Sequence, residues 1–171
     1  IYDRLVGSEM CIRDSIIRNT LGAADAMGAT PMDRPEWTAV DYATGLVYLA
    51  LTNNDNRAPD DVNAANPRPN NEFGHIIRWK EGAVVTEFEW EFFVFGSSAE
   101  AEASSINMSG LTDENEFSSA DGICFDQRGI LWLQTDATLN NDIDVDNQIL
   151  AVIPDGPVSY THLRAHETVV Y

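Results

Sequence analysis

An arginine and a glutamate at the start of a predicted strand are the residues whose chemistry is easiest to interpret. Arg34, Pro35 and Glu36 stand near the start of the stretch from Thr30 to Asn54. Because proline fixes its own φ and disfavours the helical region for the residue before it, we expect Arg34 to be extended. Residues two apart in an extended chain point the same way. Arg34 and Glu36 should therefore project together, as a cation suited to phosphate beside a carboxylate.

Two short strands joined by a tight turn are predicted to position this pair. Trp37–Asp41 is short and apolar and ends in a turn that contains Gly45. Leu46–Leu51 is a nearly continuous apolar run with β-branched and aromatic residues, which is typical of a strand buried on both faces. Polar turn-forming residues, Asn53 and Asn54 among them, then end the strand.

A weaker copy of this pattern runs from Ser119 to Asp136, about 85 residues further along the chain. When Glu36 is set against Asp121, the turn residue Gly45 falls on Gly129 after the loss of one residue. Both copies carry an acid at the head of the first strand. The alternative explanation is chance similarity between two hairpins.

Each copy is followed by a further candidate strand, His75–Lys80 in the first and Asn147–Ile153 in the second. A repeated, multistranded all-β unit is typical of a β-propeller, and the long spacing indicates blades with large insertions. The innermost strands of a propeller line a central channel. Glu36 and Asp121 are therefore expected to converge there.

Four sequence motifs carry a resemblance to a known family. TPMDRPEW, LTNN, ANPRPNNEFGHIIRW and SADGICFDQRGILWLQTD, between about Ala24 and Ile153, resemble the PhoX-type alkaline phosphatases. The resemblance implies an all-β fold, a six-bladed propeller of which this chain is about two blades with long polar insertions. It also implies a centre of calcium and iron, and hydrolysis of phosphate monoesters in the periplasm or after secretion. A chain with an incomplete ring is expected to be inactive alone.

Phosphate chemistry suggests a role for each candidate site residue. Metal ions stabilise charge on the phosphoryl oxygens and activate water, and carboxylates hold such cations. We expect Glu36 to ligate metal and Asp121 to be a second metal ligand. Arg34 is the expected catalytic residue, binding the phosphoryl group. The alternative is that Arg34 and Glu36 form only a local surface ion pair.

Two other functions stay open at this stage. One is a propeller that binds a ligand without catalysis, and the other is a calcium-dependent propeller esterase or lactonase. The sequence also departs from the resembled family, because that family's export signal and its early block with a cysteine ligand are missing. Its Pro-Asp-Gly motif reads Ala120-Asp121-Gly122 here, which keeps the acid.

The two ends of the chain are expected to lie outside the domain. Residues 1–15 and 158–171 resemble translated sequencing-adapter read-through, so the partial propeller domain is placed at 16–157. Composition limits the partners: 10 basic against 28 acidic residues give a net charge of −18, which disfavours nucleic-acid binding. No apolar run approaches 18 residues, so no membrane span is expected.

The long polar segment Asn53–Phe73 has two interpretations. It is either a solvated surface loop or a channel-mouth loop in which Asn53, Asn54 or Arg57 helps to bind metal or phosphate. His75, as a single histidine at the head of a strand, is interpreted as a packed strand residue rather than a ligand.

Three further segments carry structural predictions. Val85–Phe95 alternates aromatic and acidic residues, which predicts a half-buried strand at an outer edge. Cys124 is expected to be buried as a small apolar residue. Ile16–Met27 reads as a short helix or connecting segment that stops at Gly28. The D-x-D-x-D sequence from Asp142 to Asp146 fails as an EF-hand loop because asparagine replaces the required glycine.

Overall fold

The computed structural model describes residues 13–84, 87–136, 147–154 and 161–163. The chain divides into two units, Ile1–Pro31 and Met32–Tyr171. Among the described residues there is no helix with the length and apolar character needed to cross a membrane. The D-x-D-x-D sequence lies outside the described residues, as do most of the end segments predicted to be read-through.

In the first unit, helix α2 spans Thr20–Ala26. The side chain of Asn19 caps it by accepting a hydrogen bond from the Gly22 amide at 3.1 Å. Gly28 follows with a φ of +66°, the left-handed conformation that commonly ends helices. The predicted short helix and its glycine stop are confirmed.

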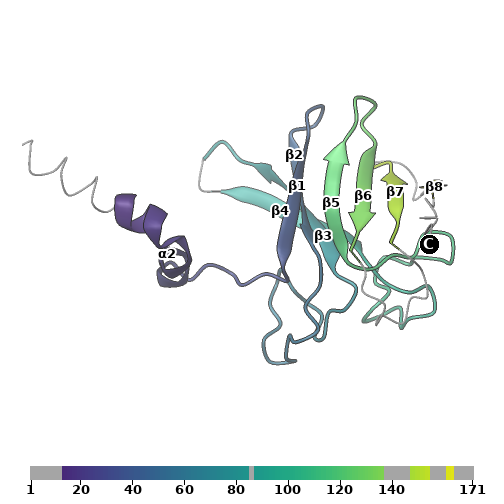
Figure 1. Cartoon of the computed structure of the whole chain (residues 1–171), viewed down its shortest axis with the longest axis horizontal. Helices are drawn as coiled ribbons and strands as arrows, with labels where there is room; N and C mark the ends of the chain where they lie inside the picture. The colour runs from purple at the N-terminus through teal and green to yellow at the C-terminus, as the bar shows by residue number, and fades with distance from the viewer. Residues whose placement is uncertain (1–12, 85–86, 137–146, 155–160, 164–171) are drawn as a thin grey trace, which may run out of the picture. The chain divides into compact units, whose positions relative to one another are not determined.

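The described strands of the second unit form two antiparallel four-stranded sheets, each with its strands in chain order (Figure 1). The predicted strand at Leu46–Leu51 and its partner beginning at His75 are both present, and so is the paired strand that follows each hairpin. The first sheet contains β1 (Pro35–Asp41), β2 (Leu46–Leu51), β3 (His75–Glu81) and β4 (Phe88–Phe95). The second contains β5 (Ala120–Phe125), β6 (Leu131–Thr135), β7 (Ile149–Val152) and β8 (Thr161–Leu163).

The two sheets share an irregularity at the same place. The register of β1 on β2 shifts between Pro35 and Thr38, and that of β5 on β6 shifts between Ala120 and Ile123. Ala120 follows Pro35 by 85 residues, and Ile123 follows Thr38 by 85 (120 − 35 and 123 − 38). Bulges of this kind redirect side chains at sheet edges. A shared bulge at the acid-bearing position makes chance similarity between two hairpins a poor explanation.

The turns of the two hairpins also match. Gly45 and Gly129 have φ values of +75° and +78°, which a residue with a side chain adopts at a cost. Asp41 and Asp126 begin the turns. The Asp41 carboxylate accepts a hydrogen bond from the Ala43 amide, and the Asp126 carboxylate accepts from the amides of Arg128 and Ile130. The predicted correspondence of Gly45 with Gly129 is thus present in the structure.

The core lies between the sheets. Tyr48 is fully buried and packs edge-on against Phe93 of its own sheet and Phe125 of the other, with ring centroids 5.1 Å apart in both cases. Burying an aliphatic or aromatic side chain of this kind contributes about 1.5–3 kcal/mol. The buried apolar cluster comprises Ala39, Tyr48, Ala50, Ile76, Val94, Leu111, Phe117, Ala120, Ile123, Leu131, Leu133, Leu150 and Val152.

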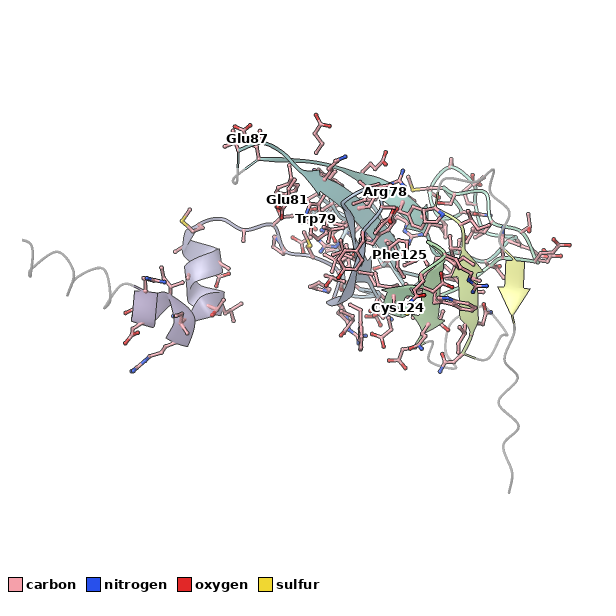
Figure 2. The ribbon with its side chains drawn as sticks, turned by 90° about the horizontal axis from the view of Figure 1, so that it is seen from above. Arg78, Trp79, Glu81, Glu87, Cys124 and Phe125 are labelled. Atoms are coloured by element: carbon pink, nitrogen blue, oxygen red, sulfur yellow. The ribbon has the colours of Figure 1, made fainter. Side chains whose placement is uncertain are left out.

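Two burial predictions were wrong. Cys124 is exposed, because it lies on the face of β5 opposite to the one that Ile123 packs against the first sheet; Figure 2 labels it beside Phe125. In β4, Phe88 is 59% exposed, whereas Val94 and Phe95 at the other end are buried. β4 is the outer strand of its sheet as predicted, but only its last residues reach the core.

Candidate functional site

Arg34 and Glu36 lie together, as predicted, but the backbone reason was wrong. Their side chains form an ion pair with Nη2 3.6 Å from Oε1. Arg34 is not extended: its φ is +48°. This conformation lets its carbonyl accept a hydrogen bond from the Thr52 amide at 3.1 Å, just after β2 ends. The pairing with β2 therefore overrides the local preference set by Pro35.

Ser119 holds the same place in the second sheet. It has a φ of +56°, and its carbonyl accepts a hydrogen bond from the Asp136 amide at 2.9 Å. Asp121 follows two residues later, as Glu36 follows Arg34. The first strand of each sheet, β1 or β5, thus carries its acid two residues after a residue in the same strained conformation.

The carboxylates of the two sheets are close enough to interact. The pKa of Asp121 is raised by burial, then by the negative charges of Glu36 and Asp136, while the Arg34 cation acts in the opposite direction. The charge of Glu36 in the first sheet therefore influences the ionisation of Asp121 in the second. Asp136, which had been given no role, belongs to the same acidic surface.

This acidic surface suits an oxygen-binding cation in part. Hard cations take carboxylate oxygens, and a bound cation would offset the repulsion that raises the pKa of Asp121. Within the part of the chain that the structure describes, however, no group of three or more histidine, cysteine or acidic side chains is arranged to hold a metal ion. The described residues therefore do not form a complete metal site by themselves.

Asn53 connects the two sheets at this point. Its Oδ1 accepts a hydrogen bond from Arg34 Nη1 at 2.9 Å, and its Nδ2 donates to Ser119 Oγ at 3.3 Å. Of the three polar loop residues considered for the site, Asn53 is the one that contacts Arg34.

The other two belong to a buried network around Asp33. Asp33 is fully buried, and its carboxylate accepts hydrogen bonds from Arg57 Nε at 2.5 Å, Asn54 Nδ2 at 3.0 Å and Asn71 Nδ2 at 2.9 Å. The Arg57 side chain is only 5% exposed. A buried charge of this kind is stable only when it is paired and hydrogen-bonded. Much of the long loop is therefore an ordered polar core, and neither of the two predicted interpretations describes it fully.

His75 is a packed strand residue, as predicted. It is fully buried, with its ring nitrogens 3.1 Å from Asn71 Nδ2 and 2.8 Å from the Ala65 carbonyl oxygen. Burial lowers its pKa to about 4, so the imidazole is neutral at physiological pH. Its role is to join the loop to β3.

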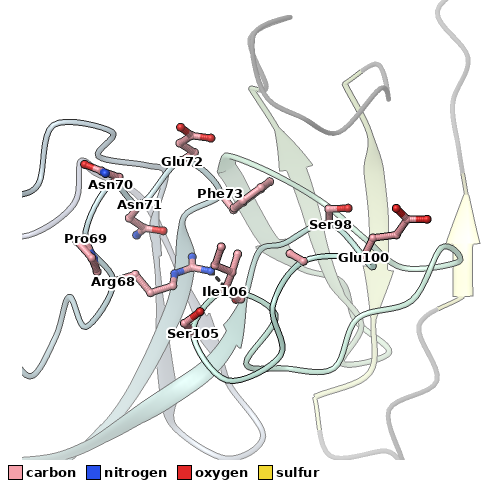
Figure 3. Close-up of a pocket in the computed structure, with 11 residues that line it drawn as sticks. Arg68, Pro69, Asn70, Asn71, Glu72, Phe73, Ser98, Glu100, Ser105 and Ile106 are labelled. Carbon is pink, nitrogen blue, oxygen red and sulfur yellow. Dashed lines mark hydrogen bonds between the residues drawn. The ribbon is translucent and has the colours of Figure 1, made fainter. Parts of the chain in front are cut away.

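A cavity of about 630 Å³ lies between two loops (Figure 3). Arg34, Glu36 and Asp121 are not among the residues that line it. Arg68 lines it and donates hydrogen bonds to the carbonyls of Gly96 and Ile106 at 2.8 and 2.9 Å. Its buried guanidinium thus holds the loops together. The cavity is lined by Arg68, Pro69, Asn70, Asn71, Glu72, Phe73, Ser98, Glu100, Ala101, Ser105 and Ile106.

Asp33, Ser119 and Asp136 are the residues to which sequence analysis gave no role in the site. Ser119 begins the repeat and falls opposite Arg34, and this alignment was the signal for it. Asp33 carried no such signal, because an isolated acid before an arginine is typical of an exposed turn.

Comparison with known proteins gives one family and one solved structure. Residues 8–168 match the family model described as alkaline phosphatase PhoX. The chain is also similar to Pseudomonas fluorescens PhoX in complex with vanadate, a transition state analogue, with 38% identity and a TM-score of 0.67. That match covers 77% of this chain and 25% of the Pseudomonas chain, so the sequence spans about a quarter of that relative. No curated protein matches the chain.

Proposed function

Because this chain belongs to the alkaline phosphatase PhoX family, we propose that it forms part of a phosphatase that hydrolyses phosphate monoesters. The main support is the placement of Arg34 beside Glu36, with Asp121 of the neighbouring sheet in the same electrostatic environment. Because acids surround the Arg34 guanidinium, this surface suits an anionic substrate only if further positive charge is bound there. This is consistent with a phosphatase that depends on metal ions.

Each residue is assigned a part in binding. The Arg34 guanidinium carries five N–H donors and binds phosphoryl oxygens in a paired geometry. Glu36 and Asp121 hold cations through their carboxylate oxygens, calcium and iron being those proposed. When bound, the metals supply Lewis acidity and lower the pKa of a coordinated water. The side chain of Arg34 is 56% exposed, so its remaining donors are accessible to a ligand.

The repeated sheets support a fold proposal as well. Two four-stranded antiparallel sheets that share a bulge and a turn are consistent with adjacent blades of a β-propeller, six-bladed in the complete enzyme. Glu36 and Asp121 then enter one channel from neighbouring blades. We place the enzyme in the periplasm or outside the cell, and we expect this chain alone to be inactive because its ring is open.

The test is substitution of Arg34 in the full-length, metal-loaded enzyme. Arg34→Ala should lower kcat/KM for an aryl phosphate monoester by about 10- to 100-fold, the loss expected for a hydrogen bond to a charged group. Arg128→Ala is the matched control, since Arg128 is also an exposed arginine bonded to a carboxylate, but in a hairpin turn. An Arg34→Ala enzyme within twofold of wild type would refute the assignment.

A further inference from the structure

The amide of Asn53 has an orientation that its neighbours determine. A guanidinium can only donate hydrogen bonds, so the Asn53 atom 2.9 Å from Arg34 Nη1 is the oxygen. Its nitrogen then faces Ser119 Oγ at 3.3 Å and donates to it. The half-buried Asn53 side chain is thus matched to both partners at once.

Arg34 requires such a partner to be held in one place. Its ion pair with Glu36 spans 3.6 Å and involves two exposed side chains, a type of contact that adds little stability. Fixing a long, free arginine side chain also costs conformational entropy, which such a weak contact does not offset. The hydrogen bond to Asn53 Oδ1 is shorter and better defined than that ion pair, so it determines where the guanidinium lies.

Ser119 gives Asn53 a rigid anchor on the second sheet. It is fully buried, and its hydroxyl lies 3.1 Å from that of Ser118, which donates to the Glu72 carbonyl at 3.4 Å. Asp121, the second candidate ligand, lies two residues after Ser119. The Arg34–Asn53–Ser119 connection therefore fixes the guanidinium of one sheet relative to the acid of the other.

We propose that Asn53 is a positioning residue for phosphate binding, acting through Arg34 and anchored by Ser119. This proposal rests on the proposed phosphatase function. Asn53 reaches the substrate only through the guanidinium, so its loss should weaken phosphate binding in the presence of Arg34 and have little effect in its absence.

The experiment measures kinetics and phosphate inhibition in the full-length, metal-loaded enzyme. Asn53→Ala should raise the inhibition constant of inorganic phosphate, and the KM for an aryl phosphate, by about tenfold. In an Arg34→Ala background the same change should alter either constant by less than twofold. Ser119→Ala should raise both by two- to fivefold, which provides a second variant if Asn53→Ala does not fold.

The matched control is Asn56→Ala, an exposed amide in the same loop that contacts Asp55 rather than Arg34. An Asn53→Ala enzyme that behaves like Asn56→Ala would overturn the positioning role. A double variant, Asn53→Ala with Arg34→Ala, whose fold-loss equals the product of the two single losses would overturn it as well. A wild-type enzyme without activity on phosphate monoesters would instead overturn the proposed function.

Discussion

Arg34 and Ser119 occupy equivalent positions in the two sheets, and both have left-handed backbone conformations, with φ values of +48° and +56°. The carbonyl of each accepts an amide hydrogen bond from the residue that follows the second strand of its hairpin. A left-handed conformation costs a residue with a side chain about 1–2 kcal/mol. The same strain in both repeats indicates that the sheet pairing imposes it.

This strain predicts an unusual order of stability at Ser119. Ser119→Gly and Ser119→Ala both lose the hydroxyl that accepts from Asn53, but only glycine relieves the strain. The glycine variant should be more stable than the alanine variant by about 1 kcal/mol in urea unfolding of the full chain. At exposed Ser104, where φ is not positive, alanine should be at least as stable as glycine. A glycine variant less stable than the alanine variant at Ser119 would contradict the argument.

Gly74 should be far less tolerant of a side chain than Gly129. Both have positive φ, +69° and +78°, but a Cβ on Gly74 would stand 1.9 Å from the Thr52 carbonyl oxygen, whereas Gly129 faces open space. We expect Gly74→Ala to cost more than about 3 kcal/mol and Gly129→Ala about 1 kcal/mol, because only the former adds a backbone clash. Urea unfolding of the two variants measures the difference. Equal losses would show that β3 can shift away from Thr52.

The strands could be predicted because burial leaves a clear sequence signal. Leu46–Leu51 is apolar throughout and is paired on both sides, and the acids Glu36 and Asp121 stand at matching bulges, as the repeat indicated. Cys124 was misplaced for a related reason. Both faces of its strand carry apolar side chains, so the pattern does not reveal which face the other sheet covers.

Neither the backbone conformation of Arg34 nor the burial of Asp33 could be predicted from local rules. The backbone of Arg34 is set by the amide of Thr52, a partner 18 residues away (52 − 34), against the preference that Pro35 imposes. Similarly, Asp33 is buried because residues distant in sequence, including Arg57 and Asn71, converge on its carboxylate. Such networks depend on tertiary contacts that composition and periodicity do not encode.

His75 should make the chain lose stability as the pH falls. Its pKa is lowered from 6.5 to about 4, first by burial and then by the nearby arginine cations, so the unfolded chain binds the proton more readily between these values. Stability from this group is therefore complete above about pH 6.5 and is lost toward pH 4. Between pH 7 and 5 the wild type should lose about 2 kcal/mol more than His75→Gln, which stays neutral. Urea unfolding at the two pH values measures this loss, and an NMR titration of the imidazole near pH 6.5 would contradict it.

In the metal-free chain, Asp121 should have the opposite effect, making the chain lose stability as the pH rises. Its pKa is raised by burial and by the charges of Glu36 and Asp136, so the folded state holds the proton more tightly than the unfolded state does. Stability from this carboxyl is present at low pH and is lost as the pH rises through its folded pKa. With a chelator present, Asp121→Asn should therefore be slightly more stable than wild type at pH 8, by less than about 1 kcal/mol, and the two should converge as the pH falls below the ordinary carboxyl range. The neutral variant Asp60→Asn, at an exposed loop position, controls for the amide itself. If Asp121→Asn were the less stable chain at pH 8, the carboxylate would be making a favourable contact that offsets its repulsion from Glu36, and the acids would not need a cation between them.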